Sequence, residues 1–343
     1  MSVLRYMSRM AVLAGCLWGT AAQAQDIHFS QFYETSVLRN PALTGIFDGD
    51  YKVTFQYRNQ WSSISKPFQT AMVTGETRIA VNDEVNDYVS IGLQAAYDKA
   101  GSISLQTVQF LPSINYNKSL ENDRNTYLSM GFTGGYVERS FDRTKMTFNN
   151  QYVNGSYDPL NGNGEQLASN KFGYFDLGAG VSLNSGAGLD NKIKYYLGFA
   201  GYHFTGAKNS FYNNSEMKLK MRWSANGGMR WSLNPDYDVY FHANYAVQGA
   251  YKELLLSGMV GYNMYDQAQE VMLSLYAGVV YRMQDAIVPV VKLNYKQVAF
   301  AVSYDINISA LKQASNGRGG MEISAFLVGK KHDSYNRTRC PHL

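Results

Sequence analysis

The sequence predicts an all-β protein, an antiparallel up-and-down transmembrane β-barrel of about fourteen strands with a short N-terminal plug-like segment. Three observations predict this fold class. Polar and apolar residues alternate along most of the chain, the first residues have the features of a secretory signal, and long and short connections alternate between the predicted strands. Only 17% of the 343 residues are charged and 14% are aromatic. This composition is untypical both of soluble domains and of disordered chains.

Residues 1–24 have the features of a signal peptide. Arg5 and Arg9 supply the positive start, residues 10–19 a short apolar core, and Ala22-Gln23-Ala24 a small-residue cleavage site. A lipoprotein signal is the alternative, because Leu13-Ala14-Gly15-Cys16 resembles a lipid-attachment box. That box begins so soon after Arg9 that almost no apolar core would be left, and so we expect ordinary cleavage after Ala24.

Residues 25–50 precede the first strand and show no strand periodicity. Their apolar side chains would form an unfavourable patch in water, so we expect them to be buried in or beneath the periplasmic mouth of the barrel. A disordered leader is the alternative. The residues expected to form this plug, or to bind a partner, are His28, Phe29, Gln31, Phe32, Tyr33, Asn40 and Pro41.

From Tyr51 onward the hydrophobic period is two, which is typical of half-buried strands. The clearest case is 218–233, where Leu, Met and Trp alternate with Lys, Arg and Ser. The predicted strands start near Tyr51, Phe68, Tyr88, Ser102, Asn125, Phe172, Lys192, Lys218, Tyr237, Tyr251, Glu270, Asp285, Val298 and Gly319. Several strands carry related glycine–tyrosine patterns, at 131–136, 198–202 and 258–262, as expected of a repeated sheet.

The connections between these strands indicate an orientation. The longest, near 142–171 and 206–217, follow odd-numbered strands, whereas those after even-numbered strands, such as 234–236, are mostly tight. Outer-membrane barrels have an even strand number, short periplasmic turns and long outer loops. We therefore predict a barrel over 51–331 in the cell outer membrane, a tail at 332–343, and both termini in the periplasm.

The two faces of the strands should meet different surroundings. The apolar face would contact lipid, with aromatic residues such as Trp61 and Trp223 near the interfaces. The other face would line the lumen, and there Arg58 is expected to pair with Glu322 or Asp98. The basic lumen residues are expected to be Lys52, Arg58, Lys218, Lys220, Arg222 and Arg230.

A soluble secreted β-sandwich or propeller would show the same alternation, because it also buries one face of each strand. The secretory signal, the loop asymmetry and the even strand count favour the barrel. A helical membrane protein is excluded, since beyond the N-terminus no apolar run approaches the roughly 20 residues that a spanning helix needs.

The sequence contains no recognised catalytic or metal-binding motif. Its five histidines show no metal-ligand spacing, and neither a nucleophile elbow nor a phosphate-binding loop is present. His242 and Asn244 share a strand face, and a barrel lipase could use such a pair beside a serine, but we favour a polar pair in the lumen. Oxygen-bearing residues at 158–165 could hold calcium, although turn formation explains the same residues. We therefore expect no enzymatic activity, no cofactor and no metal.

Cleavage of the signal would remove two arginines and leave 31 − 2 = 29 Lys and Arg against 27 Asp and Glu. This near-neutral balance argues against nucleic acid as a partner. It would also leave a lone cysteine, Cys340, either free or paired with another molecule.

Motifs at both ends of the mature chain are distinctive in combination. The chain reads Gln-Asp-Ile-His-Phe-Ser-Gln-Phe-Tyr at 25–33, Asn-Pro-Ala at 40–42 and Tyr-Arg-Asn-Gln-Trp at 57–61. It then reads Gly-Gly-Met-Glu-Ile-Ser at 319–324 and ends Cys-Pro-His-Leu at 340–343. This order resembles the PorP/SprF family of type IX secretion system outer-membrane proteins. The family tail commonly ends in Cys-Pro, a basic residue and Phe, so the final Leu puts a terminal aromatic recognition signal in doubt.

The resemblance implies a non-enzymatic barrel that serves type IX protein secretion and, in some lineages, gliding motility. The partners it implies are other secretion components, a periplasmic peptidoglycan-associated protein, outer-membrane lipid and a large secreted adhesin at the cell surface. The alternative is a FadL-like transporter of hydrophobic small molecules, whose N-terminal hatch carries a similar Asn-Pro-Ala tripeptide. A transporter should have a greasy lumen, whereas the lumen predicted here is basic and polar.

Overall fold

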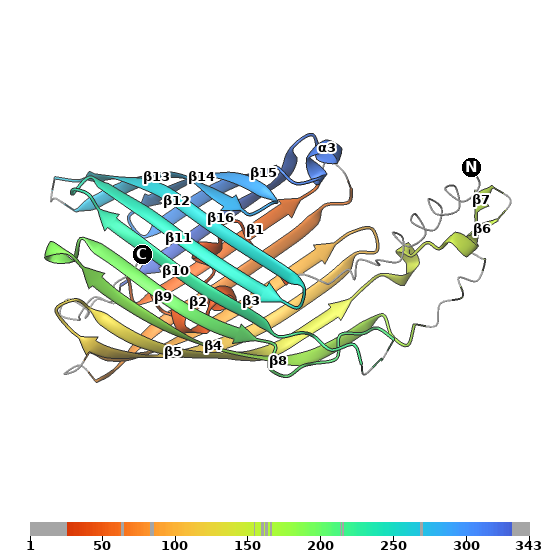
Figure 1. Ribbon diagram of the computed structural model, residues 1–343, viewed down its shortest axis with the longest axis horizontal. Coiled ribbons are helices and arrows are strands. Elements are labelled where there is room, and N and C mark those ends of the chain that lie inside the picture. Colours follow the sequence, from red (N-terminus) through yellow and green to blue (C-terminus); the bar gives the residue numbers. More distant parts are fainter. Residues whose placement is uncertain are drawn as a thin grey trace, which may run out of the picture.

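The wall of the molecule is one closed antiparallel barrel of fourteen strands (Figure 1). The computed structural model describes residues 26–62, 65–82, 86–153, 155–158, 161, 164, 167–212, 214, 216–267 and 270–330. The wall strands are β1 (Tyr51–Gln60), β2 (Phe68–Asn82), β3 (Asp87–Ala100), β4 (Leu105–Glu121), β5 (Thr126–Ser140), β8 (Lys171–Ala187), β9 (Ile193–Tyr202), β10 (Arg222–Ser232), β11 (Tyr237–Gln248), β12 (Tyr251–Tyr265), β13 (Val271–Arg282), β14 (Ala286–Tyr295), β15 (Val298–Asn307) and β16 (Arg318–Gly329). The predicted up-and-down barrel is thereby confirmed.

The barrel closes between its first and last strands. β1 pairs with β2 on one side and with β16 on the other, from Tyr51 opposite Gly329 to Gln60 opposite Gly320. Because every wall strand has two hydrogen-bonded neighbours, no strand edge is left open. A closed ladder is also what a spanning sheet needs, since a bilayer core offers no partners for free backbone groups.

The two faces of the wall are inverted relative to a soluble protein. Large apolar side chains point outward and are exposed, for example Val73 on β2, Phe132 on β5 and Leu197 on β9. Polar side chains such as Thr54, Gln56 and Asn115 point inward and are buried. Apolar-out, polar-in alternation is the pattern of an outer-membrane barrel, whose outer face contacts lipid.

The predicted boundary of β10 is wrong by four residues. The apolar–polar alternation continues upstream to residue 218, but the strand begins at Arg222. The extended chain before it pairs instead with its own loop, because Leu219 N–H donates to the carbonyl of Ala207 over 2.8 Å and Lys218 forms a bridge with Lys208. Alternation in the sequence therefore marks extended backbone, not membership of the wall.

The longest connections lie at one end of the barrel, called here the long-loop end (Figure 1, right). They span residues 141–170, 203–221 and 308–317, and the opposite end is called the short-turn end. The predicted alternation of lengths is only partly correct, because two connections at the long-loop end, 249–250 and 283–285, are tight hairpins. Such hairpins need only two or three residues, so length alone does not identify the side of a connection.

The connections contain the remaining regular elements. The 141–170 connection carries η3 (Arg143–Lys145), η4 (Asn149–Gln151) and the two-stranded sheet of β6 (Tyr152–Val153) and β7 (Ser156–Tyr157). Two further short helices are η5 (Leu189–Asn191), between β8 and β9, and α3 (Leu311–Ser315), between β15 and β16. In the described part of the chain, no helix has the length and hydropathy needed to cross a bilayer.

Residues 26–50, called here the N-terminal segment, lie inside the barrel and appear as red and orange coils within its outline (Figure 1). The segment contains η1 (Phe32–Glu34), α2 (Ser36–Arg39) and η2 (Pro41–Leu43). Asn40 caps η2, because its side-chain oxygen accepts from Ala42 N–H over 2.9 Å and Pro41 supplies a preset first helical residue. One-turn helices are not stable alone in water, so contacts with the wall must hold this conformation.

We expect Phe132→Arg, in the middle of β5, to destabilise the barrel in a bilayer by about 2–4 kcal/mol, the usual cost of an arginine facing lipid at mid-depth. Denaturant titration of protein folded into lipid vesicles measures this loss. Met217→Arg is a matched control, since Met217 is as exposed as Phe132 (53% and 52%) but lies in a loop. Equal effects of the two substitutions would contradict a lipid-facing surface at Phe132.

Candidate functional site

Two buried carboxylates near the long-loop end hold the start of the N-terminal segment. Glu322 on β16 accepts from two successive backbone groups, Ser30 N–H at 2.7 Å and Gln31 N–H at 2.9 Å. Asp305 on β15 accepts from the Ser30 hydroxyl at 2.7 Å. Hydrogen bonds to charged acceptors are about twice as strong as neutral ones. Glu322 therefore acts as a cap for a segment that has no regular backbone partner at this point.

Two guanidinium groups compensate these carboxylates. Arg58 on β1 and Arg282 on β13 both donate to Asp305, at 2.8 and 2.7 Å, and Arg58 also donates to the carbonyl of His28 at 2.7 Å. The predicted Arg58–Glu322 pair is present at 3.8 Å, whereas Asp98 accepts from Thr70 and forms no ion pair with Arg58 in the described part of the chain. Removing one member of such a buried network leaves an uncompensated charge, which typically costs several kcal/mol.

A third buried carboxylate, Glu34, belongs to the segment itself. It forms ion pairs with Lys292 on β14 and with Lys52 on β1, the latter at 3.0 Å. Burial alone would raise the pKa of Glu34, but the two ammonium groups outweigh burial and hold this pKa well below its usual value. Glu34 is therefore ionised, and it ties the segment to strands on either side of the β15–β16 pair.

Aromatic side chains of the segment fill apolar recesses of an otherwise polar lumen. Phe32 packs in a buried cluster with Leu255, Val280, Ala286, Val288 and Val290. Phe29 packs against Met72 and Ala96, and the ring of Tyr33 stacks on that of His242 with centroids 5.1 Å apart. Burying a phenylalanine side chain contributes roughly 1.5–3 kcal/mol, so these anchors matter as much as the ion pairs.

The Asn-Pro-Ala turn of the segment rests on wall glycines. The Asn40 amide donates to the carbonyl of Val181 at 3.1 Å. A methyl group on Gly180 or Gly198 would overlap the Asn40 side chain, and one on Gly131 would overlap the backbone of Pro41. The recurring glycines in the sequence therefore include positions where the wall must leave room for this turn.

The segment begins close to the long-loop end. Asp26 accepts from the Nε2 of His203, the first residue after β9, while Asp176 on β8 lies against its Nδ1, both at 2.8 Å. Burial alone would lower the pKa of His203, but Asp26 and Asp176 outweigh it and raise the pKa from 6.5 to about 9. The segment thus runs through the lumen from the long-loop end towards the short-turn end, where β1 begins. It does not reach β1 from beneath the short-turn mouth.

The structure brings together most of the residues that the sequence singled out. His28, Phe29, Gln31, Phe32, Tyr33, Asn40 and Pro41 all lie in the lumen, and Lys52, Arg58, Arg222 and Arg230 contact it. Lys218 and Lys220 do not line the lumen, because both are exposed in the connection before β10. The lumen is also less basic than expected, since carboxylates pair with Lys52, Arg58 and Arg230.

Apart from Glu322, sequence reasoning missed the acidic half of this network. Asp305 on β15 and Asp238 on β11 occupy lumen-facing positions in strands whose residues alternate between the two faces. The period-two pattern could therefore have identified them. Asp176 on β8 occupies such a position too, whereas Asp26 and Glu34 precede the strands and gain their roles only from tertiary contacts. No short-range pattern in the sequence signals those contacts.

Other sequence expectations have plain structural outcomes. His242 stacks on Tyr33, and Asn244 accepts from the Ser224 hydroxyl at 3.1 Å, so each has a partner in the lumen. Of the region 158–165, only 158, 161 and 164 are described, and the described chain contains no cluster of three or more His, Cys, Asp or Glu that could bind a metal. The signal at 1–24 and the tail at 332–343 lie outside the described residues.

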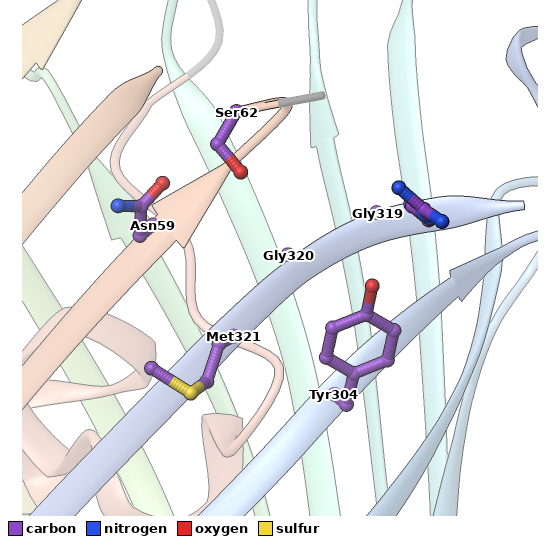
Figure 2. Close-up of a pocket in the computed structure, with 7 residues that line it drawn as sticks. Asn59, Ser62, Tyr304, Gly319, Gly320 and Met321 are labelled. Atoms are coloured by element: carbon purple, nitrogen blue, oxygen red, sulfur yellow. The ribbon is translucent and has the colours of Figure 1, made fainter. Parts of the chain in front are cut away.

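The Gly-Gly-Met motif lies at the seam of the barrel. A hollow of about 380 Å³ lies there on the outer surface. Figure 2 shows how Asn59, Tyr304 and Met321 lie around the two glycines that line it. A methyl group on Gly320 would overlap the β1 backbone, so glycine permits the close approach of β16 to β1. The next residues alternate between the faces: Met321 points outward and Glu322 points into the lumen. The glycines of the motif therefore allow the barrel to close, and its glutamate supplies a carboxylate to the lumen.

Comparison with known proteins identifies a family model described as "Type IX secretion system membrane protein PorP/SprF", which matches residues 21–325. Similar solved structures include a FadL homologue of Pseudomonas aeruginosa, at 9% identity over 84% of this chain and 92% of that chain, with a TM-score of 0.48. The toluene transporter TbuX of Ralstonia pickettii follows at 8% identity, 85% and 92% coverage and a TM-score of 0.47. These likenesses concern the barrel fold alone. A search of curated proteins finds no significant match.

Gly180→Ala should loosen the Asn40 turn, because its methyl group would overlap the Asn40 side-chain oxygen. We expect a loss of about 1–3 kcal/mol in unfolding free energy, typical of overpacking. Denaturant titration of the folded protein in detergent measures it. Gly75→Ala on β2 is the control, since its methyl group would meet no atom within 4 Å. A loss no larger than that of the control would count against a close-packed turn.

The His203 ion pairs predict a pH dependence of stability. Because the folded pKa of about 9 exceeds the ordinary 6.5, this stabilisation is fully present below about pH 6.5 and is lost as the pH rises through 9. The melting temperature of the wild type should therefore fall more between about pH 6 and 10 than that of His203→Gln, which cannot be charged. Parallel curves for the two proteins would show that His203 does not hold Asp26.

Proposed function

The chain belongs to the PorP/SprF family of type IX secretion system membrane proteins, and from this premise we propose that it acts in secretion as a closed outer-membrane partner rather than as a conduit. The barrel is the membrane anchor, and its two ends present binding surfaces to other proteins. The proposal includes a cleaved signal at 1–24, long loops on the cell exterior and a periplasmic tail at 332–343. It assigns no enzymatic activity and no cofactor to the chain.

The observation that carries this proposal is the fixed occupation of the lumen. The N-terminal segment is bonded to widely separated wall strands, for example to Glu76 on β2, Asn115 on β4, Asn226 on β10 and Glu322 on β16. A segment tied to opposite sides of the barrel occupies the lumen between the two mouths, and this supports a closed interior. This arrangement favours a protein whose surfaces bind over one whose interior conducts.

The lumen chemistry also disfavours the alternative of a FadL-like transporter. Such a protein would need a greasy interior path, whereas the inner wall here is mainly polar and charged. Its apolar recesses, the largest around Phe32, are already filled by the segment's own rings. We therefore give preference to the secretion partner.

The two ends suggest different partners. The short-turn end would face the periplasm and bind other secretion components, among them a peptidoglycan-associated protein. The long-loop end carries exposed tyrosines, Tyr152, Tyr157 and Tyr212, in its two longest connections. Tyrosine supplies a large contact area at low entropic cost, and so this end suits a large secreted adhesin at the cell surface.

Affinity purification of the protein from its own cells in mild detergent tests the partner assignment. Co-elution of type IX secretion components or of a large adhesin is the expected result. A variant whose 146–158 region is replaced by a Gly-Ser linker should lose the adhesin and keep the periplasmic components, with heat-modifiable migration unchanged. Elution with lipid alone would contradict the proposal and favour a transporter.

Conductance in planar bilayers tests the closed lumen. The full mature chain should conduct little, and deletion of residues 27–45 should produce large, stable channels, because the deletion removes the contacts that fill the lumen. The Gly-Ser variant of 146–158 serves as the control and should conduct as little as the full chain. An unchanged conductance after the deletion would mean that the segment does not close the barrel.

A further inference from the structure

A cavity of about 750 Å³, called here the vestibule, lies between the N-terminal segment and the inner wall towards the short-turn end. The segment contributes Tyr33, Glu34 and Arg39 among others, and the wall contributes residues of β1, β2 and β9–β16, with rings such as Tyr240 and Tyr276. Lys296, in the turn between β14 and β15, and Lys330, just after β16, line the vestibule at the short-turn end. The vestibule therefore opens on the side where a periplasmic partner would approach.

Arg39 is the unusual residue of the vestibule. Its guanidinium is buried, with the residue only 6% exposed, and it donates to the Tyr196 hydroxyl and, at 3.2 Å, to the carbonyl of Tyr33. Within the described chain no carboxylate lies at ion-pair distance from it, whereas Lys52, Lys292 and Arg230 of the same vestibule each have an acidic partner. A buried cation without a counter-charge is costly, and an incoming anion would remove that cost.

Further polar atoms of the vestibule are buried without a hydrogen-bond partner in the described structure. They are Arg39 Nε, Tyr33 Oη, His242 Nδ1 and Asn294 Oδ1. Three of the four can donate, which matches the oxygens of a carboxylate, and the Asn294 oxygen can only accept, which matches a peptide N–H. His242 is 8% exposed, so its unpartnered Nδ1 is about as buried as the Arg39 guanidinium.

We propose that the vestibule binds a peptide segment of a partner protein that carries a carboxylate, with Arg39 as the anchoring cation. The volume lies within the 300–1,000 Å³ typical of ligand sites, and its aromatic walls suit the side chains next to the acidic residue. That the peptide belongs to a secretion component rests on the proposed function. The binding chemistry itself does not.

The charge of the chain's own tail argues for a separate partner. Residues 331–343 contain Lys331, Arg337 and Arg339 against a single acid, Asp333. The short-turn end of the vestibule has a mixed charge, because Asp48, Asp266 and Glu270 line it together with Lys296 and Lys330, and Lys330 pairs with Asp48 at 3.8 Å. The selection therefore rests on the buried Arg39 guanidinium, which an acidic peptide from another protein complements and which repels the basic side chains of the tail.

Fluorescence anisotropy with purified protein in detergent tests the site. The probes are three labelled heptapeptides of Gly and Ser that carry three Glu, three Gln or three Lys residues. We expect the Glu peptide alone to bind, and we expect Arg39→Gln to weaken its binding by about tenfold or more, since the substitution removes a charged donor. Equal binding of the Glu and Gln peptides, or undiminished binding by Arg39→Gln, would overturn the proposal.

Two further variants separate recognition from folding. His242→Phe keeps the ring that stacks on Tyr33 but lacks the nitrogen, and it should also weaken the Glu peptide. Lys218→Gln removes an exposed charge at the long-loop end and should change nothing. Loss of heat-modifiable gel migration by Arg39→Gln would mean that this variant does not fold into a barrel. The binding of the Glu peptide by His242→Phe is then the test, and unchanged binding would overturn the proposal.

Two other results have distinct meanings. Displacement of the peptide by equimolar free glutarate would assign the vestibule to a small dicarboxylate and would overturn the peptide proposal. Failure of the peptide to bind, while secretion components still co-purify from cells, would overturn the vestibule site and leave the proposed function intact. Peptide binding without such co-purification would support the site and contradict the secretion role.

Discussion

The structure depends on one constraint: a closed barrel with an apolar exterior must satisfy its polar groups on the inside. The N-terminal segment supplies partners to the buried charged groups of β15 and β16. Glu322 accepts from the Ser30 and Gln31 N–H groups, while two arginines of the wall compensate Asp305. Without the segment these carboxylates would face an open lumen. The N-terminal segment and the strands β15 and β16 are therefore joined in one buried polar network.

Contacts between the N-terminal segment and the wall explain the motifs at 25–33, 40–42, 57–61 and 319–324 together. Glu322, Arg58 and the backbone at 30–31 meet in one network, and Asn40 rests on the glycines of β8 and β9. The same fixed interior explains why we assign the functional surfaces to the two ends. One end offers tyrosine-bearing loops, and the other offers a vestibule with an uncompensated guanidinium.

Local patterns in the sequence predict the wall well, because the alternation of faces is repeated in every strand. Fourteen strands and their order follow from it, and only extended loops such as 218–221 mislead. The pairing inside the lumen could not be predicted in the same way. Arg58 was expected to pair with Glu322 or Asp98. It lies opposite Glu322 and pairs with it at 3.8 Å, but its shorter ion pair is with Asp305 at 2.8 Å, since barrel tilt and stagger decide which lumen residues meet. Asp26 and Glu34 acquire partners only after the segment folds inward.

Hydrogen exchange measured by mass spectrometry on the intact protein tests the central claim most directly, since the N–H groups of Ser30 and Gln31 are bonded to a buried carboxylate and not to a regular ladder. The account predicts that peptides covering residues 28–39 exchange as slowly as the wall strands β15 and β16. Exchange of these peptides as fast as the exposed 203–221 connection would contradict it, because the segment would then lie loosely in an open barrel.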